Sequence, residues 1–170
     1  ISSSQLERAT KLIKEAKKPI IVCGGGVRYS GAENELLEFA EKYNIPIAET
    51  QAGKGIIDWK NPLNVGGIGV TGGKAANVIG RDADLVIGVG TRFSDFTTSS
   101  KWLFNENRKV LGINVCPFDA YKMDAEAIVA DAKEAVKALI SSCEGYKSEY
   151  TNEIKEAKAE WDKIVDEYYS

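Results

Sequence analysis

Three consecutive glycines are the first residues in this chain whose type and spacing could carry chemistry. Gly24, Gly25 and Gly26 directly follow the apolar run Pro19–Cys23, which is typical of a buried parallel strand entering a tight loop. Backbone N–H groups exposed in such a loop can face an anion such as a pyrophosphate. The pattern is not GxGxxG, because Tyr29 stands where the third glycine belongs. Close packing of the strand against a helix explains the glycines equally well.

Other polar loops follow the remaining apolar runs. Ligands of a parallel sheet bind beyond the carboxyl ends of its strands, so loops that follow strands are candidates for one nucleotide-sized cleft. Arg92 in one of these loops could pair with a phosphate, and a solvated arginine is an equally good interpretation. The candidate loops span residues 24–31, 53–73, 88–95 and 114–119.

Composition excludes several classes of function. The chain has no histidine, which removes histidine nucleophile activation, general bases and metal ligands. A net charge of -3 without a dense basic window disfavours nucleic acid as a partner. The longest apolar stretches are too short to span a membrane. The widely spaced Cys23, Cys116 and Cys143 form neither a disulfide framework nor a CxxC motif, which fits a reducing cytoplasm.

Alternating apolar runs and helical stripes predict the elements that position these loops. The expected class is α/β, a doubly wound, Rossmann-like parallel sheet of about six strands with helices on both faces. The segment 66–69 could add a short strand within the long loop 51–73. Helices are expected at 4–17, 31–43, 73–80 and 131–142, and strands at 19–23, 45–48, 84–89, 109–115 and 127–130.

The last segment has a helical stripe of its own. We expect residues 146–169 to form one helix that contacts a C-terminal domain or another subunit, with an ordinary terminal helix on the same sheet as the alternative. The domain boundaries are therefore placed at 1–145 and 146–170, the second being a linker helix. Because the chain opens with Ile1 and closes directly after this helix, it is expected to be a piece of a longer protein. The stripe comprises Tyr150, Ile154, Trp161, Val165 and Tyr168.

The order of several motifs resembles a known family. Strand-GGG, IPIAET with GKG, NVGGIGVTGG, ADLVIGVGTRFSDF and KVLGINVCPFDAYKMDAEAIVADAKEAV are similar to the central domain of thiamine-diphosphate-dependent enzymes of the acetohydroxyacid synthase and pyruvate oxidase type. The resemblance runs from about Leu6 to Ile140. TRFSDFTTSSKWLF and CPFDAYKMDA resemble most the branch that opens a cyclic dione ring in myo-inositol breakdown.

The resemblance implies that catalysis lies outside this chain. In that family thiamine diphosphate and Mg²⁺ sit between an N-terminal domain, which supplies a glutamate, and a C-terminal domain, which supplies a GDG motif. No GDG occurs here, and neither Glu15 nor Glu49 is assigned the glutamate's role. The resemblance thus implies no catalytic residue and no metal ligand in this chain. The implied partners are the N- and C-terminal domains of the parent chain, within a homo-oligomer.

The resemblance also implies a nucleotide position. Central domains of this family carry FAD, ADP or nothing, and flavin-binding members have two acids where this chain has Asn114 and Cys116. FAD is therefore doubtful, and no cofactor is expected in this chain. A free-standing nucleotide-binding module and a ligand-free structural protein stay open as alternatives. The cofactor-binding positions carried over are Gly24, Gly25, Gly26, Gly67, Gly69, Thr91, Arg92 and Phe93.

Overall fold

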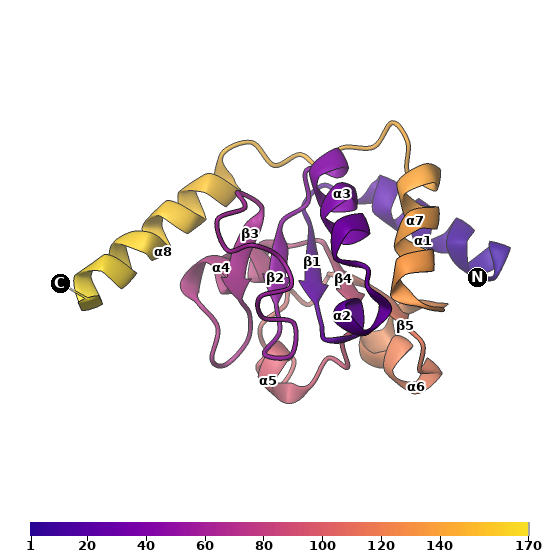
Figure 1. The fold of residues 1–170 in the computed structure, drawn as a ribbon, viewed down its shortest axis with the longest axis horizontal. Helices are drawn as coiled ribbons and strands as arrows, with labels where there is room; N and C mark the ends of the chain where they lie inside the picture. Colours follow the sequence, from indigo (N-terminus) through magenta and orange to yellow (C-terminus); the bar gives the residue numbers. More distant parts are fainter. Residues whose placement is uncertain (170) are drawn as a thin grey trace.

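A single parallel sheet forms the centre of the computed structural model, which describes residues 1–169 (Figure 1). Its six strands lie in the order β3-β2-β1-β4-β5-β6, and every neighbouring pair is parallel. The predicted doubly wound α/β fold of about six strands is therefore confirmed. The strands are β1 (Pro19–Cys23), β2 (Ile47–Glu49), β3 (Asn64–Gly67), β4 (Leu85–Val89), β5 (Lys109–Asn114) and β6 (Glu126–Val129).

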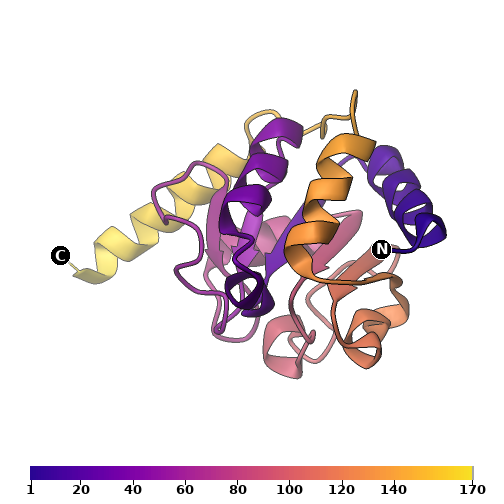
Figure 2. The same ribbon diagram turned by 45° about the vertical axis from the view of Figure 1, so that its right-hand side comes forward.

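Helices cover both faces of the sheet, as the rotated view also shows (Figure 2). Buried residues of α1, α3 and α7 share one apolar cluster with one face of the strands. Buried residues of α4 and α8 share a second cluster with the other face. The helices are α1 (Ser3–Glu15), α2 (Gly26–Ser30), α3 (Glu33–Tyr43), α4 (Lys74–Asp82), α5 (Asp95–Thr98), α6 (Pro117–Ala120), α7 (Ala132–Ser142) and α8 (Glu153–Tyr169), with a 3-10 turn at Lys122–Asp124.

Strand β1 shows why its sequence is apolar throughout. All five of its residues are buried. Because successive side chains point to opposite faces of a strand, Ile20 and Val22 enter one cluster and Ile21 and Cys23 enter the other. A central strand covered on both faces therefore needs a continuous apolar run.

The connection to the last helix differs from the prediction. Helix α8 begins at Glu153, so the expected helix start at 146 is wrong. Residues 146–152 before it belong to no helix and form a strap whose backbone bonds to the domain: the N–H of Ser148 donates to the carbonyl of Tyr43, and that of Glu149 donates to the carbonyl of Lys17. These N–H groups donate to carbonyls elsewhere in the domain, so they are not available for the hydrogen bonds of a helix.

The first half of α8 packs on the domain. Ile154 is buried in the cluster that includes α4, and Ala157 and Trp161 pack against it. The far end of the helix extends away from the sheet in Figure 1, and Tyr168 and Tyr169 are exposed there. That residues 146–170 link to another domain stays a prediction, and residue 170 lies outside the described residues.

Candidate functional site

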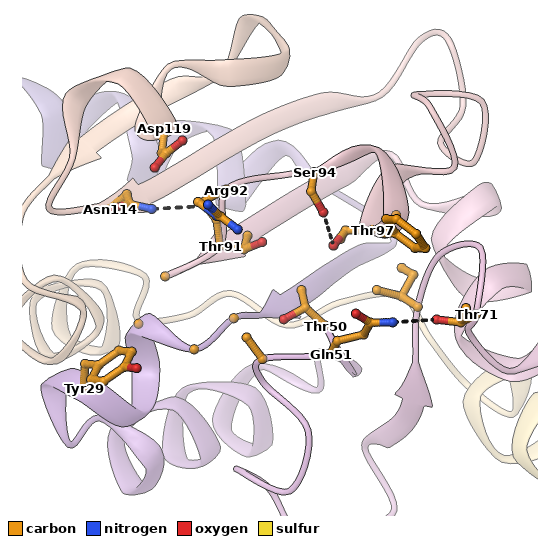
Figure 3. A pocket seen from close by; sticks show the side chains of 17 residues that line it. Tyr29, Thr50, Gln51, Thr71, Thr91, Arg92, Ser94, Thr97, Asn114 and Asp119 are labelled. Atoms are coloured by element: carbon orange, nitrogen blue, oxygen red, sulfur yellow. Dashed lines mark hydrogen bonds between the residues drawn. The ribbon is translucent and has the colours of Figure 1, made fainter.

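A cleft of about 400 Å³ opens at the carboxyl edge of the sheet. It lies where the strand order reverses between β1 and β4, which is the place where open α/β sheets bind ligands. Figure 3 shows Arg92 and Asn114 on one side, opposite Tyr29, Thr50 and Gln51. The lining comprises Gly24, Gly25, Gly26, Tyr29, Thr50, Gln51, Ala52, Ile68, Thr71, Gly90, Thr91, Arg92, Ser94, Phe96, Thr97, Asn114 and Asp119.

The three glycines do not play the same part. A Cβ on Gly24 would lie 2.3 Å from the carbonyl oxygen of Gly90, and one on Gly26 would lie 2.7 Å from the Cα of Gly90. Both are required because two backbone segments touch there, which is the close-packing interpretation. Gly25 has more room, since its nearest neighbour would be the Ala52 Cβ at 3.2 Å. Its N–H donates to no group within residues 1–169, so it is the one of the three that can serve a ligand.

The anion site suggested by the sequence is small. Helix α2, which follows the glycines, has only five residues, and its N-cap is Gly25. A helix this short carries little of the partial charge that stabilises a phosphate at a helix N-terminus. Exposed Arg92 is the cation among the lining residues.

The structure gives different surroundings to the three consecutive residues Thr91, Arg92 and Phe93. Thr91 is buried at the cleft wall, and its Oγ1 accepts a hydrogen bond from the Phe93 N–H at 3.3 Å. Phe93 has φ +47° and turns into the core, where a Cβ on Gly88 would lie 2.3 Å from its ring. Phe93 therefore fills space beside the sheet and does not line the cleft, which departs from the sequence-based expectation.

Gly67 and Gly69 also lie outside the cleft lining, although Ile68 between them belongs to it. Gly69 has φ +103°, and a Cβ there would lie 2.0 Å from the carbonyl oxygen of Phe96. The N–H of Val70 donates to that same carbonyl. Gly69 is thus needed for the close approach of two loops.

The residues that replace the two acids are engaged within the protein. The Asn114 amide donates to the carbonyl of Thr91 at 3.1 Å, and its Oδ1 accepts from the N–H of Cys116 at 3.0 Å. Asp119, the carboxylate lining the cleft, pairs with Lys122 at 2.8 Å. Asn114 therefore offers no carboxylate to a ribose hydroxyl, and Asp119 is already ion-paired.

Few titratable side chains line the cleft. Its lining contains one carboxylate, one guanidinium and one phenol, and no cysteine, lysine or histidine. Cys23 lies beneath it in the core, and burial raises the pKa of its thiol to about 12, so the thiolate is disfavoured. Within residues 1–169, no group of three or more metal-binding side chains lies together.

Several cleft residues were not predicted as site residues from the sequence, although Ser94 lies in the candidate loop 88–95. Thr50 and Gln51 follow β2, so the rule that sites follow strands could have found them. Ser94 and Thr97 are hydrogen-bonded to each other at 3.3 Å across the start of α5, a short helix that the periodicity did not indicate.

The same elements, in the same order, occur in a known protein family. Residues 6–139 match the family described as "Thiamine pyrophosphate enzyme, central domain". The chain belongs to this thiamine pyrophosphate enzyme family. The match ends at α7, so β1 to β6 and the cleft are all elements of the family's central domain.

Three relatives of this chain carry the same name. The chain is 53% identical over 172 residues to the 3D-(3,5/4)-trihydroxycyclohexane-1,2-dione hydrolase of Clostridium tetani, covering 99% of this chain and 27% of that protein. It is 54% identical over 165 residues to the hydrolase of that name from Geobacillus thermodenitrificans, covering 97% and 26%. The Bacillus cereus protein is 54% identical over 164 residues, covering 95% and 26%.

The chain spans about a quarter of the length of these curated relatives. Their alignment reaches past the family match and includes the strap and α8. No helix within residues 1–169 has both the length and the apolar character needed to cross a membrane.

Proposed function

We propose that this chain is the central domain of a thiamine-diphosphate-dependent enzyme that hydrolyses a trihydroxycyclohexane-dione. The observation that carries the proposal is identity above one half to three hydrolases of that name along 95% or more of the chain. The alignments cover nearly all residues and therefore include the loops that form the cleft.

Within such an enzyme this domain holds the neighbouring domains in position and supplies no catalytic residue. The residues of the cleft do not fit thiamine diphosphate with Mg²⁺, because Mg²⁺ needs a carboxylate ligand and the one in the lining, Asp119, is already paired with Lys122. The proposal places the cofactor contacts and Mg²⁺ in the N- and C-terminal domains of the parent.

Exposed aromatic side chains around the cleft support contacts with those domains or with another subunit. Tyr29 and Phe96 line the cleft and are 94% and 61% exposed, and Phe118, beside Asp119, is 77% exposed. Aromatic rings at one edge of a domain favour a covered surface. The proposed parent is a cytoplasmic homo-oligomer, in keeping with three cysteines that form no disulfide.

A nucleotide in the cleft is the second candidate. The free N–H of Gly25 and the exposed Arg92 at the strand-order reversal favour a phosphate there. FAD fits poorly, because Asn114 already uses its amide within the protein and offers no carboxylate to a ribose.

Calorimetry on the chain tests the non-catalytic assignment. We expect no heat of binding with thiamine diphosphate and Mg²⁺ and no ring opening of the dione. ADP serves as the comparison ligand for the cleft, with Arg92→Ala as the variant that weakens phosphate binding. Saturable thiamine diphosphate binding at one site would contradict the assignment.

A further inference from the structure

A second cavity of about 390 Å³ adjoins the cleft. The two share part of their lining, and the hydrogen bond from Gln51 to Thr71, 3.2 Å long, lies between them at the right of Figure 3. The motif that contains Gly67 reaches this cavity, but no sequence pattern joined its walls, because they come from segments far apart in the chain. They are Glu49, Thr50, Gln51, Lys54, Gly67, Ile68, Thr71, Gly73 and Trp161.

Glu49 is a buried acid with one unused oxygen. It ends β2 and is only 6% exposed. Its Oε1 accepts from the N–H of Gly55 at 3.2 Å and from the Asn64 amide at 3.3 Å. Its Oε2 accepts no hydrogen bond within residues 1–169, and it is not among the fully enclosed unpartnered atoms, so it has access to the cavity. That oxygen lines the cavity and can accept a hydrogen bond from a ligand hydroxyl without giving up a contact within the protein.

Trp161 gives the same cavity a flat apolar wall. A Cβ on Gly73 would lie 3.0 Å from its indole ring, so the ring is seated directly against the backbone of the glycine. The indole is partly buried against the cluster beneath it. Gln51 and Thr71 add neutral polar groups, and exposed Lys54 adds the one cation.

We propose that this second cavity binds a polyhydroxylated ring, with adjacent hydroxyls donating to Glu49 Oε2 and the ring lying against Trp161. Hydroxyl groups form short, strong hydrogen bonds to carboxylates. The C–H faces of a saturated ring pack on an indole, and amide and hydroxyl side chains satisfy the remaining hydroxyls. This assignment does not depend on the proposed hydrolase.

Two kinds of molecule carry such a hydroxylated ring. One is a free cyclic polyol, which would occupy this cavity alone. The other is the ribose of a nucleotide whose phosphate reaches Arg92 in the cleft, since an acid that follows the second strand of such a sheet is well placed for ribose hydroxyls.

Titration followed through tryptophan indole N–H signals tests the proposal on the 170-residue chain. The chain has three tryptophans, and Trp161→Phe identifies the signal that reports on the cavity. The probes are myo-inositol, ribose, AMP and 3′-deoxy-AMP. We expect a saturable shift of the Trp161 signal with at least one hydroxylated probe, while the signals of Trp59 and Trp102 stay in place.

Variants then assign the contacts. Glu49→Gln should weaken binding about tenfold or more, because it replaces the accepting Oε2 with a donor. Glu38→Gln removes the same charge from an exposed site on α3 and should leave affinity unchanged. If Glu49→Gln does not fold, Trp161→Leu provides the test at a partly exposed wall and should also weaken binding.

Two comparisons show whether the hydroxylated ring belongs to a nucleotide or to a free polyol. A nucleotide source requires that AMP bind more tightly than 3′-deoxy-AMP and that Arg92→Ala weaken AMP alone. A free-polyol source requires that myo-inositol or ribose bind equally well to Arg92→Ala. No shift of the Trp161 signal with any probe, or equal affinities for Glu49→Gln and the unmodified chain, would overturn the proposal.

Discussion

Replacing Ile154 by alanine tests whether the start of α8 belongs to the core of this domain. Ile154 is 6% exposed and shares a cluster with residues of β1, β3 and α4. The substitution removes three carbon atoms from a packed site without touching any polar contact. Val165 lies farther along the same helix and is only partly buried, so Val165→Ala is the matched control.

The expected magnitude follows from burial. Three buried carbons contribute roughly 2.4 kcal/mol at about 0.8 kcal/mol each, and the cavity left behind adds to this. Buried isoleucine-to-alanine changes cost about 2–5 kcal/mol in general. For a domain of this size, 1 kcal/mol lowers Tm by roughly 2–4 °C, so a loss of at least about 2.4 kcal/mol in Ile154→Ala should lower it by at least about 5 °C. Val165→Ala should cost less than about 1 kcal/mol.

Urea unfolding monitored by circular dichroism measures both variants, with sedimentation to establish that each stays at the same mass. A lower midpoint at an unchanged m-value assigns the effect to stability. The reasoning is refuted if Ile154→Ala is as stable as Val165→Ala, because α8 would then not be packed on α4 in solution.

Four further expectations follow. Gly24→Ala should lose at least about 2 kcal/mol of stability in urea unfolding, because its methyl would lie 2.3 Å from a backbone carbonyl oxygen; stability within about 0.5 kcal/mol would contradict the close packing. A hydrogen bond from Lys18 lowers the pKa of Glu153 to about 2, so its contribution is present above the unfolded pKa of about 4.3 and lost as pH falls toward 2. Glu153→Gln should therefore lose less Tm on acidification than the unmodified chain, and equal losses would contradict this. A thiol reagent should label exposed Cys116 and leave the two buried cysteines unmodified until the chain unfolds, as counted by mass spectrometry, and three rapid labels would contradict the burial. Purified chain should lack flavin absorbance and show weak or no FAD binding by fluorescence, because Asn114 offers no carboxylate to the ribose; a yellow protein would contradict it.

Periodicity was enough to predict most of the fold. Continuous apolar runs such as Leu85–Val89 are buried strands, because helices cover both faces of the sheet. The helical stripe in α3 is likewise buried against the same sheet. The residues between these elements are held by side chains, since the Asp84 carboxylate accepts from the N–H groups of Lys17 and Lys18 just ahead of β1.

Periodicity failed where tertiary contacts take over the backbone. Tyr146 and Tyr150 have helical spacing, yet the Tyr146 hydroxyl donates to the carbonyl of Ala16 and both tyrosines lie outside any helix. Phe93 stands beside two cleft residues in the sequence, but its positive φ turns the ring into the core. A pattern of residue types records neither a long-range hydrogen bond nor a left-handed backbone.

The second cavity shows the same limit. Glu49 is a single acid after a short strand, and its partners Gly55 and Asn64 follow at different distances along the loop. The opposite wall, Trp161, comes from a helix more than a hundred residues away and was interpreted as part of an interface stripe. Only the packing of α8 on α4 brings the acid and the indole to one cavity.

The central claim is that this chain serves as the central domain of a trihydroxycyclohexane-dione hydrolase. The most direct test replaces the matching quarter of the Clostridium tetani hydrolase with residues 1–170 and measures ring opening of the dione. A second chimera carrying the central domain of an acetohydroxyacid synthase is the control. We expect the first chimera to retain activity within about tenfold of the parent, a loss of no more than about 1.4 kcal/mol in transition-state stabilisation, and the control to fall well below it. A first chimera that assembles like the parent and binds thiamine diphosphate, yet opens no ring, would contradict the claim.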